Sequence, residues 1–254
     1  MSASVEIVTH CYCPPGVDQY AEYLRWQFAS LVRWARDLRV TWTVCFTRQD
    51  PVTTRMIEGI ETALSVARPG LLLRAVDLEP AYLFRRAIGR NFRALETLAD
   101  VVWFTDVDYL FGLDCLATVL RLVAPTDGLR LPAEILIHRD HATGDADVAA
   151  ARGVLLPAPD PTHFLPRRQR TAIGGVQIVG GDTARERGYC RDSKWVEPVD
   201  PAAGFRSCKC DRAYRRLNGF RAVRLPIPNV YRLRHGTDGR DFTADGRDAG
   251  REVW

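Results

Sequence analysis

Two aspartates, Asp106 and Asp108, are separated by one residue in the segment WFTDVDYLF. Side chains two residues apart in an extended segment point to the same side, so we expect both carboxylates to face one way. Oxygen ligands of this kind suit Mg²⁺ or Mn²⁺, which usually keep phosphate oxygens in their remaining positions. The same short pattern also arises by chance at the start of loops, so its meaning depends on the elements around it.

The aspartates follow the last of four apolar segments that have the composition of strands. These segments span residues 5–10, 39–47, 70–78 and 100–106. Between them, apolar residues recur at helical spacing, for example Tyr20, Leu24 and Phe28. This alternation predicts an α/β fold with a mainly parallel, doubly wound sheet flanked by helices. Ligands bind such sheets at the carboxyl ends of the strands, which is where Asp106 and Asp108 stand.

The second half of the sequence is less regular. Its expected elements are strands at 128–139, 174–181 and 220–235 and helices after Asp182 and at 210–219. Residues 140–170 are rich in Pro, Asp and Arg, and a loop of that length in a domain is usually functional or mobile. We expect a single domain over residues 1–254, with an irregular second half.

Composition places the chain among ordinary globular proteins, with 46% hydrophobic residues, 26% charged residues and a net charge of +4. The sequence has no apolar run long enough to span a bilayer and no secretory signal at its start, so we expect a cytoplasmic protein. Lys194 and Lys209 are the only lysines. The many arginines reflect either a GC-rich genome or bidentate contacts to phosphates.

Seven cysteines are an odd number and, without an export signal, are expected to be reduced thiols. Cys208 and Cys210, with Cys190 or with Cys11 and Cys13, could assemble a zinc site. The C-x-C spacing, however, differs from the C-x₂-C spacing of common zinc modules.

The segment 86–111, RAIGRNFRALETLADVVWFTDVDYLF, resembles the central signature of GT-A fold glycosyltransferases of the family 2 type. In that signature a basic residue and an R-N pair precede a helix and an apolar strand that ends in D-x-D. Three later segments are similar to the family's further motifs in the same order: IGGVQIVGG, CDRAYRR and RLRHG. The resemblance covers residues 4–236 and implies a nucleotide-sugar-binding half at 1–125 and an acceptor-binding half at 126–254.

The resemblance assigns the metal to Asp106, Asp108 and His235, although a histidine there could also be an exposed loop residue. It makes Asp211 the general base that deprotonates an acceptor hydroxyl in an inverting reaction. The alternative for Asp211 is a helix N-cap. Cys210 stands where the family usually has a second acidic residue, which is a departure from its pattern.

The same resemblance points to several contacts with the donor. The loop CYCPP and Thr9 would lie over the base and ribose, with Asp50 as a partner of the base, unless these are ordinary loop residues. The residues matching the basic motif are Arg86, Arg90 and Asn91, and either arginine could neutralise the diphosphate or be a solvated helix residue. Gly174 and Gly175 would let the backbone approach the sugar or acceptor, or simply form a turn.

These features predict a metal-dependent glycosyltransferase with an NDP-sugar donor, UDP-sugar favoured, and Mn²⁺ or Mg²⁺ as cofactor. The basic segment HFLPRRQR, residues 163–170, could follow a phosphate backbone. The chain is similar in size to small GT-A enzymes of phages that glycosylate hydroxymethylated pyrimidines, and this resemblance implies 5-hydroxymethylcytosine in DNA as one acceptor; a surface glycan or small molecule is the alternative. A haloacid dehalogenase-type phosphatase also uses D-x-D, but there the aspartates follow the first strand and not the fourth. A non-catalytic, Arg-rich nucleic-acid-binding protein is the remaining alternative.

Overall fold

The computed structural model describes residues 3–35, 37–67, 70–139, 158–203 and 209–233. Its main sheet has seven strands in the order β10-β6-β9-β4-β1-β2-β3. These are β1 (Ser4–His10), β2 (Arg39–Phe46), β3 (Leu71–Asp77), β4 (Val101–Phe104), β6 (Arg130–Pro132), β9 (Gln177–Gly180) and β10 (Val223–Leu225). Neighbouring strands are parallel except β9, which runs antiparallel to both β4 and β6.

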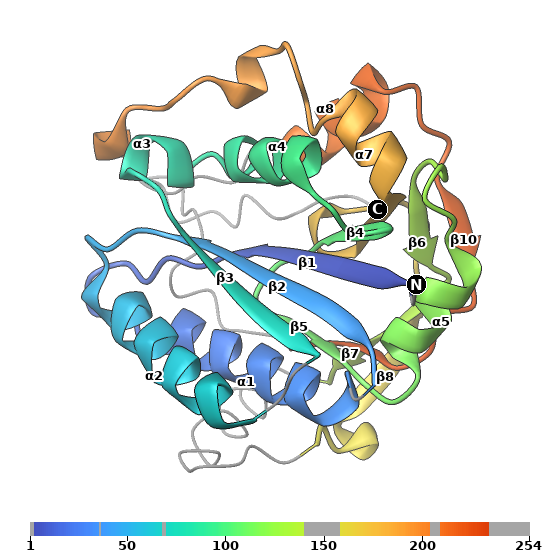
Figure 1. Ribbon diagram of the computed structural model, residues 1–254, viewed down its shortest axis with the longest axis horizontal. Helices are drawn as coiled ribbons and strands as arrows, with labels where there is room; N and C mark the ends of the chain where they lie inside the picture. Colours follow the sequence, from blue (N-terminus) through green and yellow to red (C-terminus); the bar gives the residue numbers. More distant parts are fainter. Residues whose placement is uncertain (1–2, 36, 68–69, 140–157, 204–208, 234–254) are drawn as a thin grey trace.

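Helices cover both faces of this sheet (Figure 1). On one face lie α1 (Gln19–Trp34) and α2 (Pro51–Ala67), and on the other lie α3 (Pro80–Leu83), α4 (Arg86–Glu96), α7 (Gly181–Arg187) and α8 (Cys210–Leu217). The remaining helices are α5 (Cys115–Leu122) and the short 3₁₀ helices η1 (Pro161–His163), η2 (Gly174–Val176), η3 (Lys194–Val196) and η4 (Pro201–Ala203). Among the described residues, none of these helices combines the length and the apolar character needed to cross a bilayer.

Strand β4 shows why the sequences of the central strands are continuous apolar runs. Val101 and Trp103 belong to the core beneath α1, whereas Val102 and Phe104 belong to the core beneath α4 and α7. A strand buried on both faces has no polar face to alternate with. The residues that follow Phe104 therefore leave the core at the carboxyl edge of the sheet.

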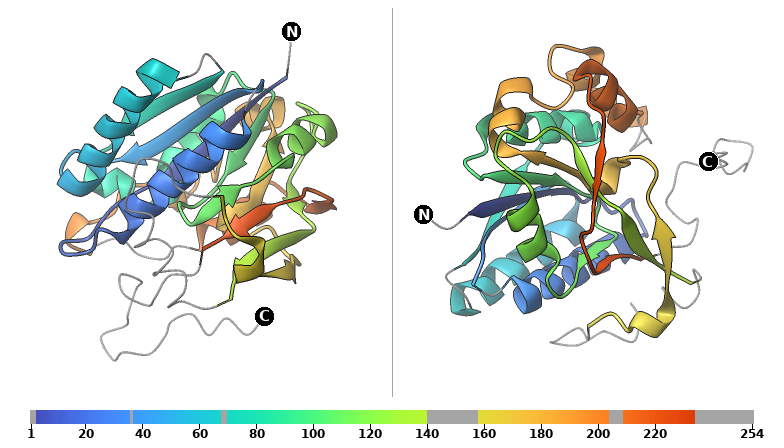
Figure 2. Two further views of the ribbon diagram at one scale, coloured as in Figure 1. Left: turned by 90° about the horizontal axis from the view of Figure 1, so that it is seen from below. Right: turned by 90° about the vertical axis from the view of Figure 1, so that its right-hand side faces the viewer.

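A second, four-stranded sheet lies beside the first (Figure 2). Its order is β5-β11-β7-β8, made of β5 (Tyr109–Phe111), β7 (Glu134–His138), β8 (Phe164–Arg168) and β11 (Val230–Arg232). Here β11 is antiparallel to β5 and parallel to β7, and β8 is an edge strand. Both sheets take strands from either side of residue 125.

The predicted α/β fold with a mainly parallel sheet and flanking helices is confirmed. Two expected strands are each divided between the two sheets: 128–139 becomes β6 and β7, and 220–235 becomes β10 and β11. The predicted loop 140–170 contains β8, while its residues 140–157 lie outside the described part of the chain.

Candidate active site

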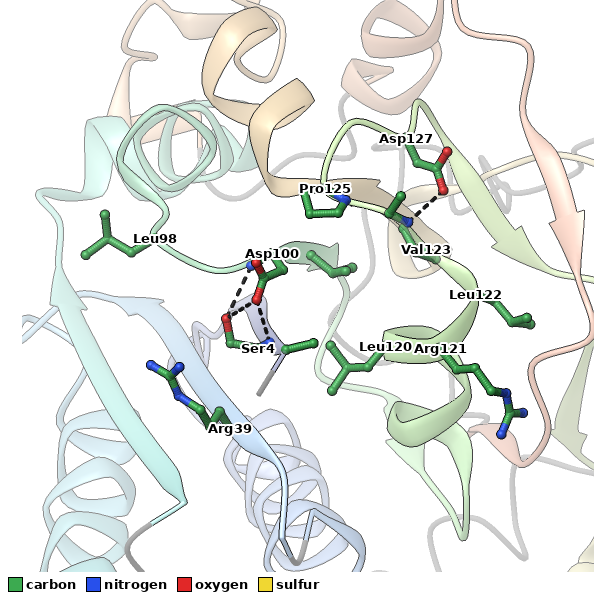
Figure 3. A pocket seen from close by; sticks show the side chains of 13 residues that line it. Ser4, Arg39, Leu98, Asp100, Leu120, Arg121, Leu122, Val123, Pro125 and Asp127 are labelled. Atoms are coloured by element: carbon green, nitrogen blue, oxygen red, sulfur yellow. Dashed lines mark hydrogen bonds between the residues drawn. The ribbon is translucent and has the colours of Figure 1, made fainter. Parts of the chain in front are cut away.

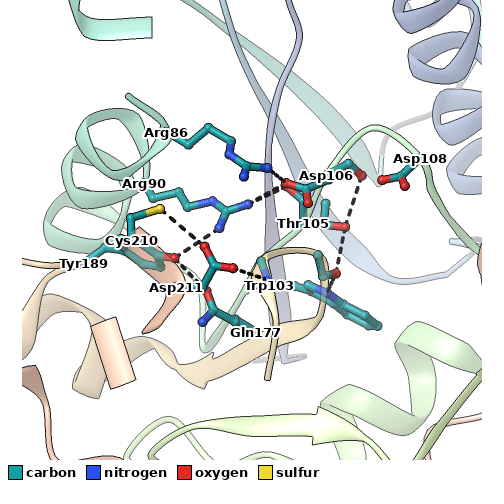
Figure 4. A network of polar contacts seen from close by, with 12 residues as sticks. Arg86, Arg90, Trp103, Thr105, Asp106, Asp108, Gln177, Tyr189, Cys210 and Asp211 are labelled. Carbon is teal, nitrogen blue, oxygen red and sulfur yellow. Dashed lines mark hydrogen bonds and ion pairs between the residues drawn. The ribbon is translucent and has the colours of Figure 1, made fainter. Parts of the chain in front are cut away.

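The site begins where β4 ends. After Phe104 the chain forms a turn, in which the amide of Tyr109 donates to the carbonyl of Asp106 at 3.2 Å. Asp106 is the first residue of this turn and Asp108 the third. Alternation of side chains holds only within extended backbone, so it does not by itself place the two carboxylates on one side. Figure 4 shows Asp106 with Arg86 and Arg90, whereas Asp108 pairs with Arg232.

Asp106 is held by two arginines of α4. Its Oδ1 accepts from Arg86 Nη1 at 2.6 Å and from Arg90 Nη2 at 2.9 Å. Residues 86 and 90 are one helical turn apart, so both side chains leave the same face of α4. The Asp106 side chain is 28% exposed, which leaves it within reach of a ligand. The two predicted donor-site arginines and the predicted metal ligand are therefore in contact.

Arg90 is fixed from behind by a buried network. Its side chain is fully buried, with Nη2 also donating to the carbonyl of Thr105 at 3.0 Å and Nη1 to the Tyr189 hydroxyl at 3.1 Å. The Tyr189 hydroxyl in turn donates to Gln177 Oε1 at 2.8 Å. Burial opposes the charge, but Tyr189 and Asp106 raise the pKa of Arg90 above its ordinary value. Arg90 therefore stays charged and orients Asp106. Tyr189 and Gln177 are positioning residues that the sequence motifs did not identify.

Asp211 reaches the same place from α8. Its Oδ2 accepts from the Gly174 amide at 3.0 Å, and Oδ1 accepts from Cys210 Sγ at 3.4 Å. A Cβ built on Gly174 would lie 3.3 Å from Asp211 Oδ2 and 3.4 Å from Asp106 Oδ2. The two carboxylates thus flank Gly174. Lys209 is the N-cap of α8 and Asp211 lies in its first turn, so the N-cap alternative for Asp211 is wrong.

Gly175 packs tightly against Tyr109. A Cβ there would lie 2.0 Å from the Tyr109 ring, so this position of η2 requires glycine. The Gly175 carbonyl accepts from Trp103 Nε1 at 3.2 Å and from the Thr105 hydroxyl at 3.1 Å. Gly175 therefore lets η2 close onto β4, and its approach to the sugar stays a prediction.

Asp108 is nearly buried, with 5% of its side chain exposed, and its Oδ2 accepts from Arg232 Nε at 3.0 Å. The Arg232 guanidinium also lies over the ring of Tyr109. This partner comes from β11, one residue before the end of the described segment 209–233, and it begins the RLRHG motif, although the sequence assigned it no role.

Two other predicted donor residues have internal partners. Asp50 is buried and accepts four bonds: from the amides of Cys13, Val52 and Thr53 and from the Thr53 hydroxyl. It therefore caps α2 and fixes the loop after β1. Asn91 is also buried, and its Oδ1 accepts from the Tyr189 amide at 2.9 Å. Asp50 and Asn91 therefore have structural partners, and their contacts with the sugar donor stay predictions.

Thr9 and His10 end β1 beneath α4. Both are buried, and neither the Thr9 hydroxyl nor either His10 ring nitrogen has a hydrogen-bond partner among the described residues. The His10 ring packs against Gly89, where a Cβ would lie 2.4 Å from Nε2. Burial, and then the charges of Arg90 and Arg86, hold the pKa of His10 well below its ordinary value. His10 is therefore neutral, and the predicted contact of Thr9 with the ribose would require it to leave the core.

A cavity lies at the opposite edge of the sheet (Figure 3). It has a volume of about 590 Å³ and is lined by Ser4, Arg39, Leu98, Asp100 and the end of α5. Because it opens at the amino ends of β1 and β4, it contains none of the predicted site residues. The candidate site is therefore the group of charged side chains around Asp106 at the carboxyl edge of the sheet, and not this cavity.

No protein-family model matches the chain, and no curated protein matches its sequence. Among solved structures, the fold is similar to that of a mannosyltransferase from Pyrobaculum calidifontis in complex with GDP-Man and Mn²⁺, with a TM-score of 0.51 and 15% identity. The match covers 90% of this chain and 56% of the other, so the chain spans little more than half the length of that enzyme. The chain has a GT-A fold.

Weaker similarities reach further chains with a GT-A fold. A galactosyltransferase, LgtC, in complex with donor and acceptor sugar analogs has a TM-score of 0.47 at 12% identity, covering 84% of this chain and 69% of the other. The bifunctional glycosyltransferase WbbM has a TM-score of 0.49 at 15% identity, covering 89% and 39%. We base nothing on these two similarities.

The GT-A resemblance implies a divalent cation. The side chains that would ligate this cation fit it in part. Both arginines bind Asp106 Oδ1, which leaves Oδ2 facing Gly174, while Arg232 occupies Oδ2 of the nearly buried Asp108. His235, the predicted third ligand, lies outside the described residues. Within the described part of the chain, no three His, Cys, Asp or Glu side chains gather as a metal site. The cysteines of the described segments are buried and form no disulfide with one another, and they do not gather as a zinc site; Cys208 lies outside these segments.

Proposed function

We propose that this protein is a glycosyltransferase that transfers a sugar from a nucleoside-diphosphate donor to an acceptor hydroxyl, with inversion. The observation that carries the proposal is the pairing of Asp106 and Asp211 on either side of Gly174, with Arg86 and Arg90 fixed on Asp106. A base, a candidate cation ligand and two positive charges thus meet at the carboxyl edge of the sheet, where open α/β folds bind ligands.

In this proposal Asp211 accepts the proton of the acceptor hydroxyl, whose oxygen attacks the anomeric carbon as the bond to the diphosphate breaks. The Gly174 amide holds Asp211 Oδ2, and its place in the first turn of α8 favours the charged carboxylate. Arg86 and Arg90 offset the charge that grows on the leaving diphosphate. A bound Mn²⁺ or Mg²⁺, held by Asp106, Asp108 and His235, would add Lewis-acid stabilisation of the same charge.

The donor in the similar mannosyltransferase is GDP-Man, whereas the sequence favours a UDP-sugar, so both belong in the test. We further propose residues 1–125 as the donor half, residues 126–254 as the acceptor half, and the cytoplasm as the location.

For the acceptor we propose 5-hydroxymethylcytosine in DNA. Strand β8 is an edge strand with Arg167 and Arg168 exposed beside the half-exposed Leu165, and exposed Arg170 follows it. Exposed arginines along an edge suit a phosphate backbone. A surface glycan or small molecule is the alternative acceptor, for which exposed arginines would be incidental.

The test combines donor binding with transfer. Thermal unfolding is followed with UDP-, GDP- and dTDP-sugars, each with and without Mn²⁺, and a donor that needs the metal to stabilise the fold identifies the substrate. That donor is then incubated with duplex DNA containing hydroxymethylcytosine, with cytosine DNA as control, and with glycan acceptors. Asp211→Asn should keep donor binding and lose about 10²- to 10⁴-fold in transfer.

Three outcomes separate the alternatives. Transfer to a glycan but not to DNA would replace the acceptor and keep the enzyme. DNA binding with a steep salt dependence, indifferent to Mn²⁺ and to every donor, would identify the non-catalytic binding protein. Equal transfer by wild type and Asp211→Asn would remove Asp211 as the base.

A further inference from the structure

Arg232 lies on the carboxylate that the proposed function assigns to the cation. Its Nε donates to Asp108 Oδ2 at 3.0 Å, and its guanidinium carbon lies 5.5 Å from the centre of the Tyr109 ring. The arginine side chain is 24% exposed, against 5% for Asp108. The guanidinium is thus an internal cation on the outer side of a nearly buried carboxylate.

A divalent cation and this guanidinium would compete for the same carboxylate. Arg232 Nε already occupies Asp108 Oδ2, and the positive charge of the guanidinium opposes the approach of a second cation to this nearly buried group. An arginine stays charged in proteins, so it cannot yield by losing its proton. A cation that takes Oδ2 therefore displaces the arginine, and one that binds Oδ1 lies beside its charge.

We propose that Arg232 competes with the divalent cation for Asp108 and so sets the affinity of the protein for that cation, an inference that rests on the proposed function. A released guanidinium needs a new partner, and a diphosphate offers it bidentate acceptor oxygens. Cation and nucleotide therefore bind cooperatively. The metal takes Asp108 from Arg232, and the diphosphate of the nucleotide replaces Asp108 as the partner of the guanidinium.

The test is a titration of Mn²⁺ against the full-length protein, with free Mn²⁺ measured by electron paramagnetic resonance, with and without UDP or GDP. Arg232→Gln should bind Mn²⁺ alone at least about fivefold more tightly than wild type, and the gain in affinity from nucleotide should shrink. The control is Arg130→Gln, which breaks the ion pair between Arg130 of β6 and the more exposed Asp127 and should leave the affinity unchanged.

Arg232→Lys is a more conservative variant, which keeps the inference testable if Arg232→Gln does not fold. It keeps the charge but lacks the planar fork, so its Mn²⁺ affinity should lie between those of wild type and Arg232→Gln. In an Asp108→Asn background, Arg232→Gln should give no further gain, because the contested carboxylate is gone.

An unchanged or weaker Mn²⁺ affinity in both Arg232 variants would overturn the inference, as would a gain that persists with Asp108→Asn. If neither wild type nor Arg232→Gln binds Mn²⁺ with any nucleotide, the cation of the proposed function is itself wrong. Binding by wild type without a gain in the variants removes the competition alone.

Discussion

Helix α4 holds two carboxylates of the main sheet with arginines, and it does so in opposite ways. Arg86 and Arg90 bind Asp106 beyond the end of β4, whereas Arg93, on the same helix face, binds Glu6 within β1. Glu6 is 1% exposed and also accepts from the Thr43 hydroxyl at 2.6 Å. Asp106 is partly exposed and turns its second oxygen toward Asp211.

The same chemistry therefore serves stability at one position and a site at the other. A carboxylate inside the sheet is surrounded by its partners and cannot take a ligand. Beyond the last residue of the adjacent strand β4, the same type of ion pair leaves one side of the carboxylate exposed. We expect mutations to separate the two roles.

The largest effect should follow Glu6→Gln, which removes the buried counter-charge of Arg93. We expect the free energy of unfolding to fall by about 3–5 kcal/mol, measured by urea denaturation. Glu96→Gln, which removes the mostly exposed partner of the same arginine, is the control and should cost less than about 1 kcal/mol. Equal losses in the two variants would contradict a special role for the buried pair.

The Glu6 pair should also show in the pH dependence. Burial opposes ionisation, but hydrogen bonds from Arg93, Thr43 and Thr97 lower the pKa of Glu6 below 4.5. Its contribution to stability is therefore present above about pH 4.5 and is lost as the pH falls through the lowered pKa.

Asp106→Asn should affect activity more than stability, the opposite of what we expect for Glu6→Gln. Transfer should fall about 10²- to 10³-fold, because the arginines lose their anchor and the cation loses a ligand. Unfolding should change less than in Glu6→Gln, since the Asp106 side chain is partly solvated. Transfer at wild-type rate from the favoured donor would show that Asp106 takes no part in the site.

The adjacent glycines Gly174 and Gly175 allow a closer comparison between an effect on transfer and an effect on stability. Gly175→Ala would drive a Cβ into the Tyr109 ring and should cost about 1–3 kcal/mol of stability. Gly174→Ala makes only tight contacts with the oxygens of Asp211 and Asp106, so it should keep the fold and lower transfer on the order of tenfold. Transfer and urea denaturation are measured for both, and a loss of stability in Gly174→Ala equal to that in Gly175→Ala would contradict this division.

The smallest effect concerns His10, beneath the same helix. Because its folded-state pKa lies below 6.5, stability is full above about pH 6.5 and falls as the pH drops toward the lowered pKa. The slope from this group is about 1.4 kcal/mol per pH unit. Urea denaturation of wild type and His10→Gln between pH 7 and 5 isolates it, and identical slopes would place His10 in contact with solvent.

The sequence predicted the central strands well because burial on both faces leaves an unbroken apolar run, as in Val101–Phe104. It predicted Asp106, Asp211, Arg86 and Arg90 as one group, and the structure brings them together. The role of Asp108 as a metal ligand stays a prediction, and the alternation used for it does not extend past Phe104 into the turn. The sequence assigned no role to Arg232 or Tyr189, because their contacts join residues about a hundred or more positions apart that no local pattern encodes.

The antiparallel strand β9 has a consequence for the order in which the protein assembles. In the main sheet β6 pairs only with β9 and β10, which are both synthesised after it. As the chain leaves the ribosome, β6 therefore waits for later strands, and such long-range pairing folds slowly. Gly174, just before β9, carries the amide that holds Asp211, so chemistry at this edge should become competent only when the last part of the sheet has closed.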